Sequence, residues 1–301
     1  MKKIYYITAV FATLFLVGCG DGIDLPGVNV ETDLNKIPLP DNNVNLEQVE
    51  LKPSTEPMLH EGLHTEEDFQ RIRDKKAAGE EPWVSAYQLL VESQFSQKTA
   101  DTYPTEWIKR GVSGDENYMN AARGATIAYQ QALRWKIEQD DEYAAKAVEN
   151  LNKWVQTCVG VTGNTNLSLA AGLYGYEFAI AGELLRDYGG WDRADFAAFQ
   201  NWLLKVFYPA NDDFLKRHHD TNALHYWANW CLCNIAAKMA IGIVTDRRDI
   251  YNEGIAHLQT GDTNGRLRRA IYHDYAPDYN FAQWQESCLL YTSPSPRDMR
   301  R

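Results

Sequence analysis

Apolar residues recur every three or four positions along most of the chain between residues 65 and 258, which is the period of an amphipathic helix. Thr65 and Asp68 have the spacing of a capping box at a helix start, and Gly79 ends the pattern that follows. The spacing predicts helices over residues 66–78, 82–91, 117–138, 141–157, 167–188, 192–207, 221–244 and 249–258. From residue 260 to residue 287 the period is lost.

The connections between these segments are short, and residues 139–141 form a tight turn between two of them. Short connections predict antiparallel helical hairpins. The chain shows no convincing alternation of apolar and polar residues typical of strands, and no exact repeat. The pattern therefore predicts an all-α fold of stacked hairpins, either an α/α toroid or an irregular bundle.

The first 57 residues do not follow this pattern. Two lysines precede an apolar run of 14 residues, 4–17, which is too short for a comfortable membrane span. The run ends in Leu-Val-Gly-Cys, which resembles a bacterial lipobox and predicts a lipoprotein signal over residues 1–19 with Cys19 as the lipid anchor. An ordinary signal peptide with a chance cysteine is the alternative. Residues 20–57 are predicted to be a flexible tether.

This interpretation predicts an exported bacterial lipoprotein, held by lipid at the outer membrane, on its periplasmic face or at the cell surface.

The last residues, 288–301, contain two Ser-Pro pairs and a basic end without helical period. They resemble a translated sequencing adapter, and a genuine disordered tail is the alternative. We therefore expect a non-native tail after a helical domain over residues 58–287 that is a fragment of a longer one.

Composition narrows the class of protein. The 301 residues are 45% hydrophobic and 24% charged, so the chain is able to bury a large core. Its formal net charge of −11 argues against nucleic acid as a partner, because phosphate binding needs a basic surface. A polyanionic substrate would need local basic clusters that override this charge. The aromatic content, 9 Trp, 17 Tyr and 10 Phe, can line clefts as well as cores. The five scattered cysteines predict no disulfide framework.

Polar and aromatic residues are most concentrated between residues 216 and 230. Asn222, His225, Tyr226 and Asn229 recur at helical spacing, which predicts that they share one face of a helix. Packing or helix capping is the alternative for the histidines and tryptophans here. A metal site built on these histidines lacks a carboxylate at matching spacing, so we predict no metal.

A second cluster combines guanidinium groups with hydroxyl, amide and carboxyl groups. Arg268 and Arg269 precede Tyr275, and Gln283 and Glu286 follow in the run Gln-Trp-Gln-Glu-Ser. Arginine pairs with carboxylates through a planar fork, and tyrosine can transfer a proton. A solvated basic patch, and a hydrogen-bonding role for Glu286, are the alternatives.

Five segments together resemble a known family: residues 62–65, 128–136, 171–176, 225–230 and 283–287. They are similar to the alginate lyase superfamily of polysaccharide lyases, and most similar to the Bacteroidetes type called polysaccharide lyase family 38. The resemblance implies an α/α toroid, incomplete in this chain, that cleaves uronic-acid polysaccharides by β-elimination and leaves a C4=C5 unsaturated uronate. It implies no metal and no other cofactor.

The resemblance also implies roles for individual residues. The catalytic set would be Asn222, His225, Arg269 and Tyr275, which neutralise the uronate carboxylate and transfer protons. Related alginate lyases place the Asn and His next to each other, whereas two residues separate them here. The substrate-binding set would be Tyr174, Tyr176, His219, Tyr226, Trp227, Asn229, Trp230, Arg268, Gln283 and Glu286.

The expected partner is therefore an anionic polysaccharide such as alginate, polymannuronate or glucuronan, with the membrane reached only through the lipid. Two alternatives belong to other classes. One is a non-catalytic helical lipoprotein that binds glycans. The other is an α/α-toroid glycoside hydrolase, which needs two facing carboxylates that no motif in this sequence indicates.

Overall fold

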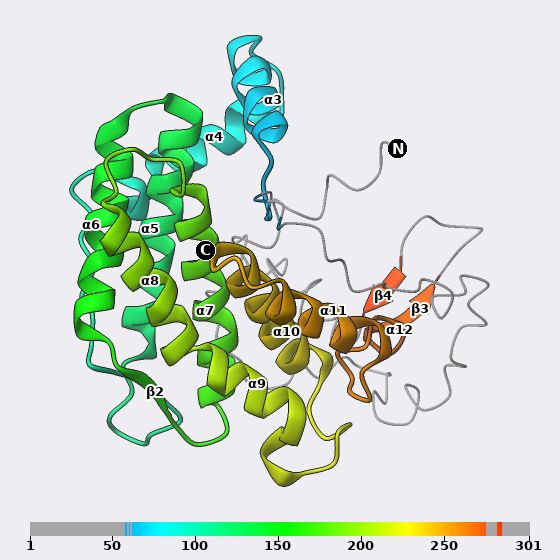
Figure 1. Cartoon of the computed structure of the whole chain (residues 1–301). Coiled ribbons are helices and arrows are strands. Elements are labelled where there is room, and N and C mark those ends of the chain that lie inside the picture. Colours follow the sequence, from blue (N-terminus) through cyan, green and yellow to red (C-terminus); the bar gives the residue numbers. More distant parts are fainter. Residues whose placement is uncertain (1–57, 59, 61, 275–281, 285–301) are drawn as a thin grey trace.

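The computed structural model describes residues 58, 60, 62–274 and 282–284, and most of these residues lie in helices (Figure 1). The helices are α3 (Glu66–Ala77), α4 (Trp83–Glu92), α5 (Tyr118–Glu138), α6 (Asp141–Thr157), α7 (Leu167–Leu184), α8 (Arg193–Val206), α9 (Tyr208–Arg217), α10 (Ala228–Val244), α11 (Arg248–Thr260) and α12 (Leu267–Ala270), with short 3-10 turns η3 (Gln94–Ser96) and η4 (His218–Asp220). The all-α prediction is confirmed, and the closure into a toroid stays a prediction. The signal peptide, the tether and the tail lie outside the described residues.

Local chemistry explains where several helices begin. The predicted capping box at Thr65 is present, because its hydroxyl accepts from the backbone of Asp68 while the Asp68 carboxylate accepts from the backbone of Thr65. The carboxylate of Asp140 accepts from the Glu142 backbone at the start of α6. These caps satisfy backbone N–H groups that have no partner within their helix.

Consecutive helices pack as antiparallel hairpins. Helix α6 lies against α5, where the Asn150 amide donates to Gln131 over 2.9 Å in the buried interface. Helix α8 lies against α7, where the Phe178 and Trp202 rings meet edge to face with centroids 5.1 Å apart. Helix α11 returns along α10 in the same way (Figure 1).

The first helices of these hairpins run in the same direction. Near the middle of α5 and α7, the Thr126 hydroxyl donates to Glu177 over 2.9 Å. Nine residues further along α5, the Trp135 ring meets the Tyr188 ring just beyond α7, with centroids 5.5 Å apart. Since both contacts advance along the two helices together, α5 and α7 are parallel neighbours.

Helix α10 continues this parallel layer. Near its start it approaches Gly172 of α7, and Arg186 just beyond the other end of α7 donates to the Val244 carbonyl over 2.8 Å. The amino-terminal ends of α5, α7 and α10 therefore lie at one end of the molecule, with β2 and the end of α9 (Figure 1).

Two small sheets join the loops. Strand β1 (Trp107–Arg110) pairs in parallel with β2 (Gly160–Gly163), so the segment before α5 is bound to the segment before α7. Strand β3 (Ile271–Asp274) pairs with β4 (Ala282–Trp284) in antiparallel fashion and with an irregular register. These strands were not predicted from the sequence, because each is only three or four residues long.

The apolar core has two parts in the described region. The larger lies between α5, α6, α7 and α8 and is rich in aromatic rings, including Trp154, Phe178 and Phe199. The smaller, formed by Phe214, Leu215, Tyr226, Cys231 and Ile235, lies between α9 and the start of α10. Cys158, Cys231 and Cys233 are free thiols, and no described helix is both long and apolar enough to cross a membrane.

A buried cation fastens α9, α10 and α11 together. The side chain of Lys238 is fully buried, and its Nζ lies 2.8 Å from Asp212 and 2.6 Å from Glu253. Lys216 also contacts Asp212 at 2.8 Å, but its side chain is 60% exposed. Removing one partner from a buried ion pair is far more costly than removing an exposed one, because the remaining charge loses its compensation.

We therefore expect Lys238→Ala to lower the free energy of unfolding by roughly 2–4 kcal/mol. Lys216→Ala, the matched control at the same carboxylate, should lower it by less than about 1 kcal/mol. Urea denaturation of both variants measures the difference. Equal losses would show that the Lys238 contacts do not hold the three helices together.

Candidate functional site

The segment predicted to start the seventh helix is a loop. Helix α10 begins only at Ala228, so the prediction that Asn222, His225, Tyr226 and Asn229 share a helical face is wrong. The Asn222 side-chain oxygen accepts from the Leu224 backbone over 2.8 Å, which offers the backbone an alternative to the helix. Immediately before it, residues 218, 219 and 220 all have positive φ, of 48°, 53° and 60°.

The loop is held on the smaller core cluster by its aromatic residues. Tyr226 is buried, with its ring centroid 5.2 Å from Phe214 and 4.7 Å from Trp230. The amide of Asn264 donates to the carbonyls of Leu224 and Tyr226 over 3.1 and 2.9 Å, which ties the loop to the segment after α11. The rings of Tyr226 and Trp230 thus pack on the smaller core cluster, and their predicted role in substrate binding stays a prediction.

Other predicted residues of this loop face solvent. The side chains of Asn222, His225 and Asn229 are exposed, and Trp227 is 58% exposed. An indole that is held by its backbone and largely open to water is suited to stack on a sugar ring. The loop therefore presents amide, imidazole and indole groups at the amino-terminal end of α10.

His219 connects this loop to the start of α7. Its Nε2 lies 3.0 Å from the hydroxyl of Ser168, in the first turn of α7. Its ring lies against Phe214 and Tyr226, with centroids 5.4 and 5.8 Å away. The neighbouring His218 is buried, which lowers its pKa, and it lies 3.8 Å from the Cys231 sulfur. His219 is therefore fixed between two helix ends.

The predicted arginines lie in α12, beside the same loop. Arg268 is exposed, and Arg269 donates to the carbonyl of Asp262. Because Asn264 binds the loop, α12 stands at the same end of the molecule as His219 and Trp227. Gln283 lies in β4 opposite His273, while Tyr275 and Glu286 lie outside the described residues.

The two predicted tyrosines of α7 have different surroundings. Tyr174 is only 6% exposed, and burial raises its pKa although the nearby charge of Arg110 opposes the shift. Tyr176 is partly buried, and burial together with the charge of Glu177 raises its pKa to about 12. At neutral pH both phenols are protonated hydrogen-bond donors.

Three residues of this end were not singled out from the sequence: Arg110, Ser168 and Asn264. Each lies at least 30 residues from the 216–230 segment or on another element, and none belongs to a local motif. No signal in a single sequence shows that an isolated serine will meet a histidine 51 positions later.

A buried polar cluster lies further along the α5–α7 interface. His64 Nε2 lies 2.6 Å from the Tyr129 hydroxyl, and burial lowers the pKa of His64 to about 4. Glu177 accepts from Thr126, and burial raises the pKa of Glu177 to about 7. Both shifts favour the neutral form, as expected where water is excluded.

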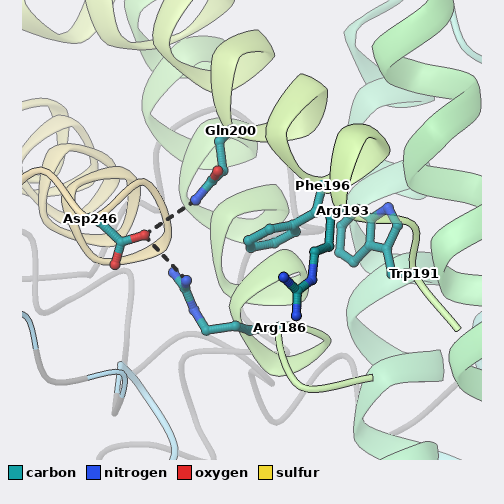
Figure 2. Close-up of a pocket in the computed structure, with 6 residues that line it drawn as sticks. All are labelled: Arg186, Trp191, Arg193, Phe196, Gln200 and Asp246. Atoms are coloured by element: carbon teal, nitrogen blue, oxygen red, sulfur yellow. Dashed lines mark hydrogen bonds and ion pairs between the residues drawn. The ribbon is translucent and has the colours of Figure 1, made fainter. Parts of the chain in front are cut away.

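A separate hollow lies at the opposite end of the parallel layer, lined by Arg186, Trp191, Arg193, Phe196, Gln200 and Asp246 (Figure 2). There Arg186 lies 3.3 Å from Asp246 and covers the Phe196 ring at 5.2 Å. Because the guanidinium and the carboxylate already satisfy each other, this hollow is a weaker candidate than the loop end.

The loop end is suited to an anionic ligand. Three helices present their amino-terminal ends there, and backbone N–H groups at such ends favour negative charge. Arg110, Arg268 and Arg269 add positive charge in a chain that is acidic overall. Within the described part of the chain, no group of three or more His, Cys, Asp or Glu side chains could hold a metal ion.

The Glu177 pKa predicts a pH dependence of stability. The usual pKa of glutamate is 4.5 and that of folded Glu177 is about 7, so between these values the unfolded chain ionises while the folded chain keeps its proton. The protonated Glu177 side chain therefore makes its full contribution to the free energy of unfolding below pH 4.5, and this contribution is lost as the pH rises to 7. Glu177→Gln, which can still accept from Thr126, should therefore gain roughly 2–3 kcal/mol over the wild type between pH 5 and pH 8.

Urea unfolding of both proteins at the two pH values measures this gain. Glu106→Gln, a change at an exposed carboxylate, is the control and should show the same difference from the wild type at both pH values. A pH-independent effect of Glu177→Gln would refute the raised pKa.

Comparison with known proteins identifies one family for the chain. A search of curated proteins finds no match to the chain. A family model described as Alginate lyase matches residues 72–270, a range that includes the parallel layer, the loop at 218–227 and α12. The family resemblance noted from the sequence is confirmed, while the family 38 type stays a prediction, and membership supports polysaccharide lyase activity in general. The chain belongs to the alginate lyase family.

Proposed function

We propose that the protein cleaves alginate or a related polyuronate such as glucuronan by β-elimination, leaving a C4=C5 unsaturated uronate. The observation that carries this proposal is the loop that joins His219 and Trp227 to the amino-terminal ends of α7 and α10. It combines donors for a carboxylate, a surface for a sugar ring and groups that transfer protons. Family membership supports the same reaction class.

The reaction needs two things from the protein. The C5 proton of a uronate is poorly acidic beside an ionised carboxylate, so neutralising that carboxylate stabilises the enolate-like transition state. A base must then remove the C5 proton, and an acid must protonate the departing O4. When the proton and the leaving group lie on the same face of the sugar, one tyrosine can do both.

Asn222 and His225 are the proposed carboxylate donor and base. Asn222 and His225 lie in the same turn, because the His225 backbone donates to the Asn222 carbonyl over 2.9 Å. Both side chains are exposed. Arg269 is proposed to add a guanidinium from α12, and Tyr275 to act as the acid. Trp227 is proposed to stack on a neighbouring sugar.

The predicted lipid anchor at Cys19 fits this function, since it would hold the enzyme outside the cytoplasm, where it has access to polymeric alginate. We propose an exported lipoprotein, with the polysaccharide as its partner and the membrane reached through lipid alone.

The test is to incubate the full chain with mannuronate-rich alginate, guluronate-rich alginate and glucuronan while following ultraviolet absorbance from the new C4=C5 bond. Rising absorbance with one of them supports the proposal and identifies the uronate. Saturated products would instead indicate a hydrolase. Binding of these polymers without any product would indicate a glycan-binding protein.

Single substitutions test the site. Asn222→Ala and His225→Ala should each lower kcat by about 10²-fold or more, as expected when charge stabilisation in the transition state is lost. Leu224→Ala, which changes an exposed side chain of the same turn, is the matched control and should keep nearly the wild-type rate. Near-normal rates for both test variants would remove these residues from the proposed site.

A further inference from the structure

Strand β1 carries one cation inward. Ile108 is fully buried, and Arg110, two residues later, extends from the same side of the strand because strand side chains alternate. Lys109, between them, instead pairs with Asp115 at 2.6 Å on the exposed side. Lys109 and Arg110 are both partly buried, but only Lys109 is paired with a carboxylate among the described residues.

The described surroundings of Arg110 do not balance its charge. Its guanidinium lies over the Tyr118 ring, 4.7 Å from the centroid. Its Nη1 is buried and has no hydrogen-bond partner, and no carboxylate pairs with it, among the described residues. The carboxylate of Glu116 accepts a hydrogen bond from the Gly111 backbone over 2.6 Å.

Strand pairing places Arg110 beside the start of α7, because it lies opposite Gly163 at the end of β2, four residues before α7 begins at Leu167. Its positive charge also acts on Tyr174 of α7 and Cys233 of α10. Tyr174 follows Ser168, the partner of His219, by six residues on α7. Cys233 follows Asn229 by four residues, about one turn or 6 Å along α10.

An uncompensated cation of this kind costs free energy. A buried N–H without a partner loses its hydration and gains no hydrogen bond in return, and the cost is larger when it carries charge. Such groups are rare in folded proteins and call for an explanation. A ligand that supplies the missing anion would explain why the residue is there, because guanidinium and carboxylate form strong charge-assisted hydrogen bonds.

We propose that Arg110 is a substrate-binding residue that pairs with a uronate carboxylate where α7 and α10 lie against each other. The inference rests on the proposed function, and it adds a cation from a strand that no sequence motif indicated. The side chain as a whole is partly exposed, so a carboxylate can reach it from the loop end. The competing interpretation is that Arg110 only packs on Tyr118.

The test compares the wild type with Arg110→Met, which keeps an unbranched side chain that can cover the Tyr118 ring but removes the charge. Binding of mannuronate and glucuronate disaccharides to the full chain is measured by calorimetry, beside the same disaccharides with their carboxylates reduced to alcohols. Thermal unfolding without ligand is measured in parallel. Lys109→Met removes a charge from the same strand and is the matched control.

For Arg110→Met we expect an affinity for charged disaccharides lower by about tenfold or more, an unchanged affinity for reduced ones, and a Tm without ligand no lower than in the wild type. Lys109→Met should keep the wild-type affinity, and Arg110→Lys should recover part of the loss.

Unchanged affinity in Arg110→Met would overturn the inference while leaving the proposed function intact. So would a lower Tm with equal losses for charged and reduced disaccharides, since that pattern indicates a packing role. If the wild type itself binds no charged disaccharide and cleaves no polyuronate, the proposed function falls, and this inference falls with it.

Discussion

The close approach of α7 and α10 is the contact on which the rest of this structure depends. At Gly172 a Cβ would lie 2.6 Å from the Cys233 sulfur and 3.0 Å from the Asn234 nitrogen, so only glycine allows the helices to meet at this distance. This contact brings the starts of two parallel helices together. The His219–Ser168 bond, the position of Tyr174 and the seam beside Arg110 all follow from it.

The two cations Lys238 and Arg110 differ in whether the protein itself balances their charge. Lys238 is fully buried and has two carboxylates within 3 Å, so its burial is compensated inside the protein. Arg110 is near the loop end, and its Nη1 has no such partner among the described residues. A net charge of −11 would repel a polyanion, so binding one requires positive groups that the fold has not already neutralised.

The α5–α7 interface shows the opposite solution for buried polar groups. Burial shifts the pKa values of His64 and Glu177 toward their neutral forms, and the two side chains form hydrogen bonds with Tyr129 and Thr126. The middle of the parallel layer thus holds polar groups whose pKa shifts disfavour charge, whereas cationic groups lie at its amino-terminal end. At the other end, the charge of Arg186 is balanced by Asp246.

The sequence by itself determined most of the helices, because periodicity, capping residues and turns act between neighbours along the chain; helix α9 at Tyr208–Arg217 lies in none of the predicted ranges. Thr65 and Asp68 form the predicted capping box, and the helices at 118–138 and 141–157 lie where the apolar spacing placed them. Its motifs also indicated the family that the comparison confirms.

Only the tertiary structure decided the start of α10 and the composition of the site. The helical spacing of residues 222–229 was overridden by the Asn222 turn, the burial of Tyr226 and the anchor at Asn264. Ser168 and Arg110 came to this end through helix packing and strand pairing with segments about 50 residues away along the chain. Contacts between such distant segments depend on how whole helices pack, and local sequence patterns do not encode that packing.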